Sequence, residues 1–346
     1  MTIKSIIISG AAYLGLSELG AIHTLIKNNI ITLNDIESFY TTSVGTIIAI
    51  IISLNLEWEL IYDYFVFRPW YKIIDINIEK ILNIFNTKGL VEEDFFISLI
   101  KPLFDYKEID INITLKDFEE KVGYKFNIFT CSFNNFDLIN INSNTHSDIN
   151  LITAINMTCS IPALFKPVEY KNDLYMDGGL IQGYPLSQCL NKYKQNEIIG
   201  IRFNFFNNEI KSFENINIIE FILKLINKMG RYISKDTYPH IDNEIIIKYS
   251  DMNYKDFEKC LSSEEKRIEL IELGIKTVNE WIIKHESEQQ DDVQQDDVQQ
   301  DDVQQEDVQQ DDVQQEDVQQ VDVQQVDVQQ VDVQQDDVQR VEVVKQ

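Results

Sequence analysis

Ser43 is the residue whose surroundings most clearly predict chemistry in this chain. An apolar, strand-like run at residues 36–40 precedes it, and a helix-like apolar run follows at residues 46–52. One serine therefore stands on a sharp strand-to-helix turn, the setting of a nucleophilic serine. The turn would hold the hydroxyl near a helix N-terminus, where backbone N–H groups favour developing negative charge. Thr41 and Gly45 flank it, so the turn reads T-x-S-x-G where the usual pattern is G-x-S-x-G.

A second segment with suitable chemistry is the loop S-G-A-A-Y-L-G at residues 9–15. It lies between the first predicted strand and the first predicted helix. Its small residues let backbone N–H groups approach a ligand, with a helix N-terminus behind them. A phosphate-binding loop is the competing interpretation, but no Gly-Lys-Ser/Thr ending follows the second glycine.

A base for the serine is the third requirement, and Asp177 is the candidate. It follows a strand-like run at residues 174–176 and precedes Gly178 and Gly179. The two glycines allow a sharp backbone turn that leaves the carboxylate projecting. Asp-Gly-Gly alone is only a turn signal. A conventional hydrolase order of serine, acid and histidine is also possible, with Asp177 orienting His240.

Taken together, four blocks resemble those of the patatin-like phospholipase family. The loop at 9–15 resembles its glycine-rich oxyanion motif, and the turn at 41–45 resembles its serine elbow. Residues 158–168, T-C-S-I-P-A-L-F-K-P-V, resemble the block before its catalytic aspartate. Residues 175–179, Y-M-D-G-G, resemble the aspartate block itself. The order and spacing agree over residues 3–205 and extend to about residue 285.

The resemblance implies a serine–aspartate dyad without histidine. Ser43 would be the nucleophile, Asp177 the general base, and the backbones of Gly10, Ala11 and Ala12 the oxyanion hole. The reaction would be hydrolysis of lipid acyl esters through an acyl-Ser43 intermediate. The family's dyad needs no metal or other cofactor, and the sequence shows no metal-ligand cluster. The implied fold is a three-layer α/β fold, with a mostly parallel central sheet flanked by helices.

Four residues depart from the family pattern. Thr41 replaces the leading glycine of the elbow, where a β-branched side chain is expected to crowd the turn. Ala11 and Ala12 replace glycines, and a positive φ at either would add strain on the order of 1–2 kcal/mol. Leu14 stands where the family commonly has Arg or Lys. These departures motivate a second hypothesis, in which an inactive domain of this family binds a lipid or a protein.

Hydrophobic patterning predicts the elements that position these residues. A strand at 3–9, a helix at 15–29, the strand at 36–40 and the helix after Ser43 alternate, which indicates a parallel sheet. Two hairpins are predicted, at 125–133 with 136–142 and at 168–170 with 173–176. Thr114 and Asp117 have capping-box spacing, and Asp148 is expected to begin a helix that runs to residue 155. Further helices are predicted at 57–67, 91–104, 216–229 and 262–284.

Aromatic side chains gather in one stretch of the predicted helical region. Trp58, Tyr62, Phe65 and Phe67 precede an Arg-Pro-Trp run at residues 68–70. They could border a mouth that admits lipid. Aromatic residues at helical spacing more often pack in a core, so both interpretations stay open.

Charge divides the chain into two predicted parts. Residues 1–285 form the globular domain, and residues 286–346 form a repeat tail of D-D-V-Q-Q units. The tail holds 20 of the 57 acidic and 2 of the 30 basic residues, and so carries −18 of the net charge of −27. It offers little apolar surface to offset conformational entropy, which predicts disorder. The tail could bind a protein, or it could self-associate through its valines and glutamines.

Composition also bounds partners and location. A mildly acidic domain argues against nucleic acid as a partner, while peripheral contact with a membrane stays open. Four widely spaced cysteines, Cys131, Cys159, Cys189 and Cys260, indicate buried free thiols in a reducing compartment. The chain opens with a strand-like run in place of a signal peptide, and its most apolar helix is too short to span a bilayer. A cytoplasmic location is therefore expected.

Overall fold

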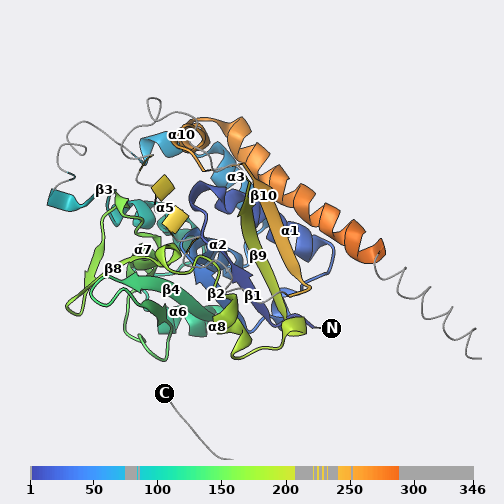
Figure 1. Cartoon of the computed structure of the whole chain (residues 1–346), viewed down its shortest axis with the longest axis horizontal. Helices are drawn as coiled ribbons and strands as arrows, with labels where there is room; N and C mark the ends of the chain where they lie inside the picture. Colours follow the sequence, from blue (N-terminus) through green and yellow to red (C-terminus); the bar gives the residue numbers. More distant parts are fainter. Residues whose placement is uncertain are drawn as a thin grey trace, which may run out of the picture. The chain divides into compact units, whose positions relative to one another are not determined.

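The central sheet gathers strands from most of the described part of the chain. The computed structural model describes residues 2–74, 86–206, 241–250 and 252–287, with single positions at 84 and between 221 and 232. Its eight strands run in the order β10-β9-β1-β2-β4-β8-β7, with β5 beside β4 (Figure 1). Their bounds are β1 (Ser5–Ile8), β2 (Ser38–Thr42), β4 (Lys125–Ser132), β5 (Leu138–Ile141), β7 (Val168–Tyr170), β8 (Asp173–Asp177), β9 (Ile198–Phe205) and β10 (Glu244–Tyr249).

Five neighbouring strands of this sheet, from β10 to β4, run parallel. Parallel neighbours need crossover connections, and α1 (Gly15–Lys27) supplies the one between β1 and β2. The helix α2 (Val44–Ser53) then leaves the end of β2. The predicted strand–helix–strand–helix order is confirmed. Because Ile8 pairs with Thr41, the loop after β1 and the turn after β2 lie side by side.

The remaining pairings are antiparallel, so the sheet is mixed. Both predicted hairpins are confirmed, since β4 pairs with β5 and β7 pairs with β8. Lys171 and Asn172 join β7 to β8 with positive φ values of 47° and 66°, as a two-residue type I′ turn requires. The strand β8 also pairs antiparallel with β4, where Asp177 lies opposite Thr130. This pairing carries Asp177 toward the end of β2.

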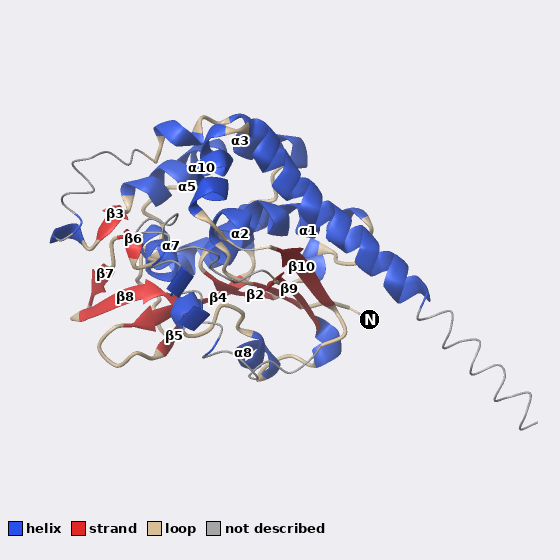
Figure 2. Cartoon of the chain, turned by 45° about the horizontal axis from the view of Figure 1, so that its top comes forward, coloured by secondary structure: helices blue, strands red, loops and turns tan. Residues whose placement is uncertain are grey.

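Alternate side chains of the parallel strands enter two different cores. In β1, Ile6 and Ile8 join the main core, while Ile7 joins a smaller one on the other face. Phe39 and Tyr40 of β2 divide in the same way. Figure 2 shows α1 and α2 over one face of the sheet and α8 (Leu186–Leu190) on the other. The result is the expected α/β fold, with a sheet flanked by helices on both faces.

Other helices surround the main core. They are α3 (Trp58–Phe67), α5 (Asp94–Tyr106), α6 (Leu115–Val122), α7 (Leu151–Cys159) and α10 (Tyr254–Ser262), followed by a helix over 264–287. A small parallel pair, β3 (Gly89–Val91) with β6 (Ala163–Phe165), lies apart from the main sheet. The predicted cap of α7 is wrong: Asn150 accepts from the Ile152 N–H, and Asp148 pairs with Lys171 instead. Asn150 stands directly before the first helical residue, where a cap must lie.

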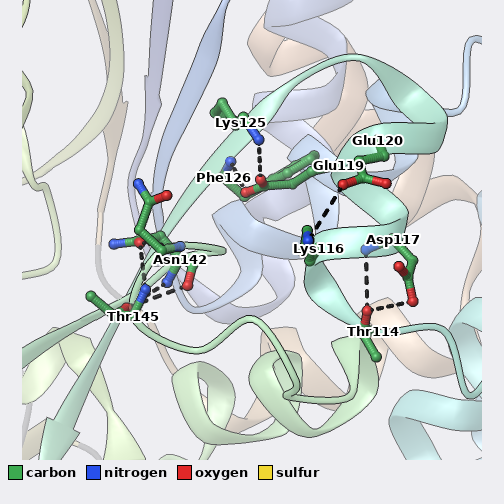
Figure 3. A network of polar contacts seen from close by, with 10 residues as sticks. Thr114, Lys116, Asp117, Glu119, Glu120, Lys125, Phe126, Asn142 and Thr145 are labelled. Carbon is green, nitrogen blue, oxygen red and sulfur yellow. Dashed lines mark hydrogen bonds and ion pairs between the residues drawn. The ribbon is translucent and has the colours of Figure 1, made fainter.

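The predicted helix start at Thr114 is confirmed for α6, which lies beside β4 (Figure 3), but only the N-cap half of the capping box forms among the described contacts. Thr114 accepts a hydrogen bond from the Asp117 N–H at 3.1 Å, and its hydroxyl donates to the Asp117 carboxylate at 2.7 Å. One turn later, the buried carboxylate of Glu119 accepts from the Phe126 N–H at 2.9 Å and pairs with Lys125 at 2.8 Å. Every oxygen of this buried carboxylate therefore has a partner.

The last described helix packs closely against α1. A Cβ atom added to Gly20 or Gly274 would overlap the backbone of the facing helix. Within the described residues no helix is long and apolar enough to cross a bilayer. All four cysteines are free and buried, as expected. The predicted helix at 216–229 falls mostly outside the described residues, as does the predicted tail beyond residue 287.

Candidate active site

Ser43 occupies a strained position between β2 and α2. Its φ of 55° and ψ of −132° lie outside the regions that non-glycine residues usually adopt, at a cost of about 1–3 kcal/mol. Although Ser43 is the N-cap residue of α2, its side chain caps no backbone N–H. The hydroxyl is therefore available for another partner, at the positive end of the helix dipole.

That partner is Asp177, which lies 134 positions later in the sequence. The Ser43 Oγ–H donates to Asp177 Oδ2 at 2.5 Å, and the Gly179 N–H donates to Asp177 Oδ1 at 2.7 Å. The strand β4 lies between the two residues, with Phe129 opposite Thr42 and Thr130 opposite Asp177. The structure thus brings the predicted nucleophile and base into direct contact.

The protonation of Asp177 is set mainly by its burial. Its side chain is only 5% exposed, and burial raises the pKa of the carboxyl from 3.8 to about 6. The hydrogen bonds from Ser43 and Gly179 act in the opposite direction, since they favour the charged form. A carboxylate with a pKa just below neutrality is ionised at pH 7 and still able to accept a proton, as a general base must.

Close backbone approach explains the glycines of the elbow and of the aspartate turn. A Cβ on Gly45 would lie 2.5 Å from the Ile8 carbonyl oxygen, and one on Gly178 would lie 2.4 Å from that of Phe129. Either contact would force the elements apart. Thr41, where the usual elbow has a glycine, is fully buried in β2, and its hydroxyl lies 2.8 Å from that of Thr46.

The predicted oxyanion loop is only partly available. The Gly10 N–H donates to the Gly183 carbonyl at 2.9 Å, so it is already engaged. The N–H groups of Ala11 and Ala12 have no hydrogen-bond partner within the described residues. Ala12 has a φ of +48°, the strained value that an alanine at this position was expected to risk. Leu14, which stands where the family commonly has Arg or Lys, is fully buried in the main core.

Two further positions escaped sequence reasoning. The Thr158 hydroxyl accepts from the Ser43 N–H at 2.8 Å and donates to the Phe129 carbonyl at 2.5 Å. It therefore holds the strained backbone of Ser43 and removes that N–H from the set of oxyanion donors. Val44, at the start of α2, has an N–H without a partner in the described part of the chain. The only signal for Thr158 was its place in the block before Asp177.

A cavity of about 460 Å³ opens beside Ser43 and Asp177. Its walls are largely apolar and include Ile47, Leu99 and Phe165. Of the predicted aromatic mouth, Phe65 lines this cavity together with Trp70. The other aromatic residues differ: Trp58 and Tyr62 pack with His23, and Phe67 is exposed on the surface. Arg202 of β9 is a cation on the cavity wall that sequence reasoning did not identify.

The alternative in which Asp177 orients His240 is not tested by the structure, since His240 lies outside the described residues. Both carboxylate oxygens of Asp177 already accept hydrogen bonds, from Ser43 and Gly179. The described residues contain no cluster of three or more His, Cys, Asp or Glu side chains that could hold a metal ion.

Comparison with known proteins places the chain in a family. A family model for patatin-like phospholipases matches residues 6–190. The chain belongs to this family. It is 28% identical over 235 residues to the "Probable lipid hydrolase 463L" of Invertebrate iridescent virus 6, an alignment covering 62% of this chain and 77% of that protein. It is 27% identical over 291 residues to "Uncharacterized protein R571" of Acanthamoeba polyphaga mimivirus, covering 82% and 94%.

One solved structure agrees on the architecture. The crystal structure of VipD from Legionella pneumophila matches with a TM-score of 0.50 and 13% identity, over 82% of this chain and 67% of that one. At that identity the likeness concerns the fold alone. Membership of the patatin-like phospholipase family, together with the viral relative, supports a lipid hydrolase.

Proposed function

We propose that this chain hydrolyses acyl esters of lipids through an acyl intermediate on Ser43. The observation that carries the proposal is the 2.5 Å contact between Ser43 Oγ and Asp177 Oδ2 at the wall of an apolar cavity. Asp177 takes the proton as Ser43 Oγ attacks the ester carbonyl, and returns it to the departing alcohol. A water molecule, activated by the same carboxylate, then releases the fatty acid.

The oxyanion of each tetrahedral intermediate needs donors that are not already engaged. The N–H groups of Ala11 and Ala12 meet this condition, and that of Val44 at the helix start is a third candidate. Gly10 and Ser43 are excluded from the set, because their N–H groups donate to Gly183 and Thr158. Gly10 supports the loop instead.

The cavity indicates the substrate. Its apolar walls fit an acyl chain, which would leave water as it enters. Arg202 pairs with Glu244 at 2.8 Å, and its Nε atom is buried without a hydrogen-bond partner within the described residues. We propose that this guanidinium contacts the polar part of the lipid, where the family commonly uses a cation at the position of Leu14.

A second candidate function is lipid binding without turnover. The observations favouring it are the positive φ of Ala12 and the engaged N–H of Gly10, which leave a smaller donor set than the family motif implies. It predicts that Ser43 does not react as a nucleophile.

Labelling with a fluorophosphonate separates the two candidates. The active form should give a covalent adduct at Ser43 by mass spectrometry and should hydrolyse p-nitrophenyl butyrate. S43A should lose both properties and keep its melting temperature. S53A is the matched control, since Ser53 lies at the other end of α2 and its hydroxyl donates to the Ile50 carbonyl, away from the proposed dyad. Folded wild-type protein that gives no adduct would refute the hydrolase and leave the binding module.

A further inference from the structure

Glu18 is a buried carboxyl group that the dyad does not use. It lies in the first turn of α1 and is fully buried. Its Oε1 atom accepts a hydrogen bond from the Ser9 hydroxyl at 3.0 Å, and its Oε2 atom has no partner within the described residues. Two other buried glutamates differ, because Glu119 pairs with Lys125 and Glu244 pairs with Arg202. Of these three, Glu18 alone has no ion pair with a cation in the described part of the chain.

A buried carboxyl with one unpartnered oxygen lowers the stability of the folded protein. Burial raises the pKa of Glu18 well above 4.5, while the Ser9 hydrogen bond opposes the rise only in part. Burial therefore disfavours the charged form of this carboxyl, and its Oε2 atom makes no hydrogen bond within the described residues. An apolar side chain of similar volume would avoid this cost, and replacing buried polar groups in this way is often neutral or stabilising. Stability therefore does not account for a glutamate at this position.

Ser9, its only hydrogen-bond partner among the described residues, accounts for the glutamate better. Ser9 directly follows β1, where its N–H donates to the Ile201 carbonyl at 3.1 Å. The elbow also rests here, since a Cβ on Gly45 would lie 2.6 Å from the Ser9 carbonyl oxygen. Ser9 begins the loop that carries Ala11 and Ala12, and Glu18 follows that loop in α1. The Ser9–Glu18 hydrogen bond therefore closes the loop across its two ends.

We infer that Glu18 is a positioning residue, which holds the Ala11 and Ala12 N–H groups in place for the oxyanion by closing their loop onto Ser9. The inference rests on the proposed hydrolase. A loop with a strained φ at Ala12 needs such a support, because relaxation of that φ would reorient the N–H groups of the loop beside Ser43. The oxyanion exists only in the transition state and the intermediates. Loss of the support should therefore lower kcat and leave KM nearly unchanged.

Three variants of this contact test the inference. E18M removes the acceptor with little change in volume, S9A removes the donor, and E18Q keeps an acceptor oxygen at Oε1. We expect E18M and S9A to lower kcat for p-nitrophenyl butyrate about tenfold, less than the loss of a whole oxyanion donor. E18Q should recover kcat to within about threefold of wild type. The rate of fluorophosphonate labelling at Ser43 should follow kcat in each variant.

Stability separates this role from a purely structural one. E18M should melt at the wild-type temperature or above it, although its kcat falls. The matched control is E119Q, which weakens a fully partnered buried glutamate on α6, in the network of Figure 3. It should melt at a lower temperature and keep the wild-type kcat.

Each other outcome overturns the inference. An E18M protein with wild-type kcat would show that the contact does not position the loop. A fall in both melting temperature and kcat that E18Q does not reverse would show that Glu18 only supports the fold. If wild-type protein is not labelled at Ser43, the proposed hydrolase fails and the inference fails with it. Normal labelling of both wild type and E18M refutes the inference alone.

Discussion

Replacing Asp177 by asparagine should abolish ester hydrolysis and, at neutral pH, make the folded protein more stable. The two effects have one cause, which is the burial of a carboxylate that the proposed reaction needs in its charged form. Asparagine has nearly the same shape and can still accept from the Gly179 N–H. It carries no charge to desolvate, and it cannot take the proton of Ser43.

The magnitude follows from the pKa of Asp177, which rises from 3.8 to about 6 in the folded state. A shift of about two units corresponds to about 3 kcal/mol. Because the folded pKa is the higher one, the stability contribution of this group is fully present below pH 3.8 and is lost as the pH rises through 6. D177N avoids that loss. It should therefore melt about 5 °C above wild type at pH 7.5, with the difference shrinking toward pH 4.5.

The assay measures the melting temperatures of wild type and D177N at pH 7.5 and pH 4.5, together with their rates of p-nitrophenyl butyrate hydrolysis. Wild-type kcat/KM should rise with a midpoint near pH 6, so that it is about tenfold lower at pH 5 than at pH 7. D173N on the same strand is the control of opposite sign. Burial acts to raise the pKa of Asp173, but hydrogen bonds from Ser132, Asn134 and Leu174 outweigh it and lower the pKa, so D173N should melt earlier at pH 7.5. A D177N protein that melts at or below the wild-type temperature at pH 7.5 would refute the reasoning.

Further substitutions test the neighbouring contacts. T158V leaves the Ser43 N–H without its acceptor, which should cost about 1–3 kcal/mol of stability and slow fluorophosphonate labelling about tenfold. Normal labelling would show that the strained backbone of Ser43 does not need the Thr158 hydrogen bond. G45A places a Cβ against the Ile8 carbonyl and should lower the melting temperature and remove hydrolysis, whereas an active G45A would mean that α2 can shift freely. R202Q/E244Q removes a cation together with its partner, so that neither of the two charges is left buried without the other. It should raise KM for phosphatidylglycerol vesicles several-fold more than KM for p-nitrophenyl butyrate, and equal changes would separate Arg202 from the lipid.

Local sequence was sufficient for the elements whose cause is local. The two hairpins follow from strand-like runs around short turns, and the turn at Lys171 and Asn172 has the positive φ values such turns need. The cap at Thr114 follows from the spacing of a hydroxyl and a carboxylate. The cap of α7 was misplaced at Asp148, because Asp and Asn both cap well and only the true start of the helix selects Asn150.

Contacts between segments that are distant in the chain could not be predicted from the sequence. That Thr158 would accept from the Ser43 N–H, or that Gly183 would occupy the Gly10 N–H, depends on how α7 and the turn after β8 pack beside the elbow. The same holds for Arg202, which reaches the cavity only because β9 lies next to β1. Residue type and spacing do not predict which distant residues become neighbours.

The sequence by itself determined the candidate residues. A serine on a strand-to-helix turn is a local pattern, and the resemblance of four blocks to the patatin-like family paired it with Asp177, which Asp-Gly-Gly alone could not do. The tertiary structure alone decided that Ser43 and Asp177 meet at 2.5 Å and that the pKa of Asp177 rises to about 6. It also decided that Ala11 and Ala12, rather than Gly10, keep unengaged N–H groups beside the elbow. The physical reason is that distance, burial and hydrogen-bond competition arise only when the strands pair and the helices cover them.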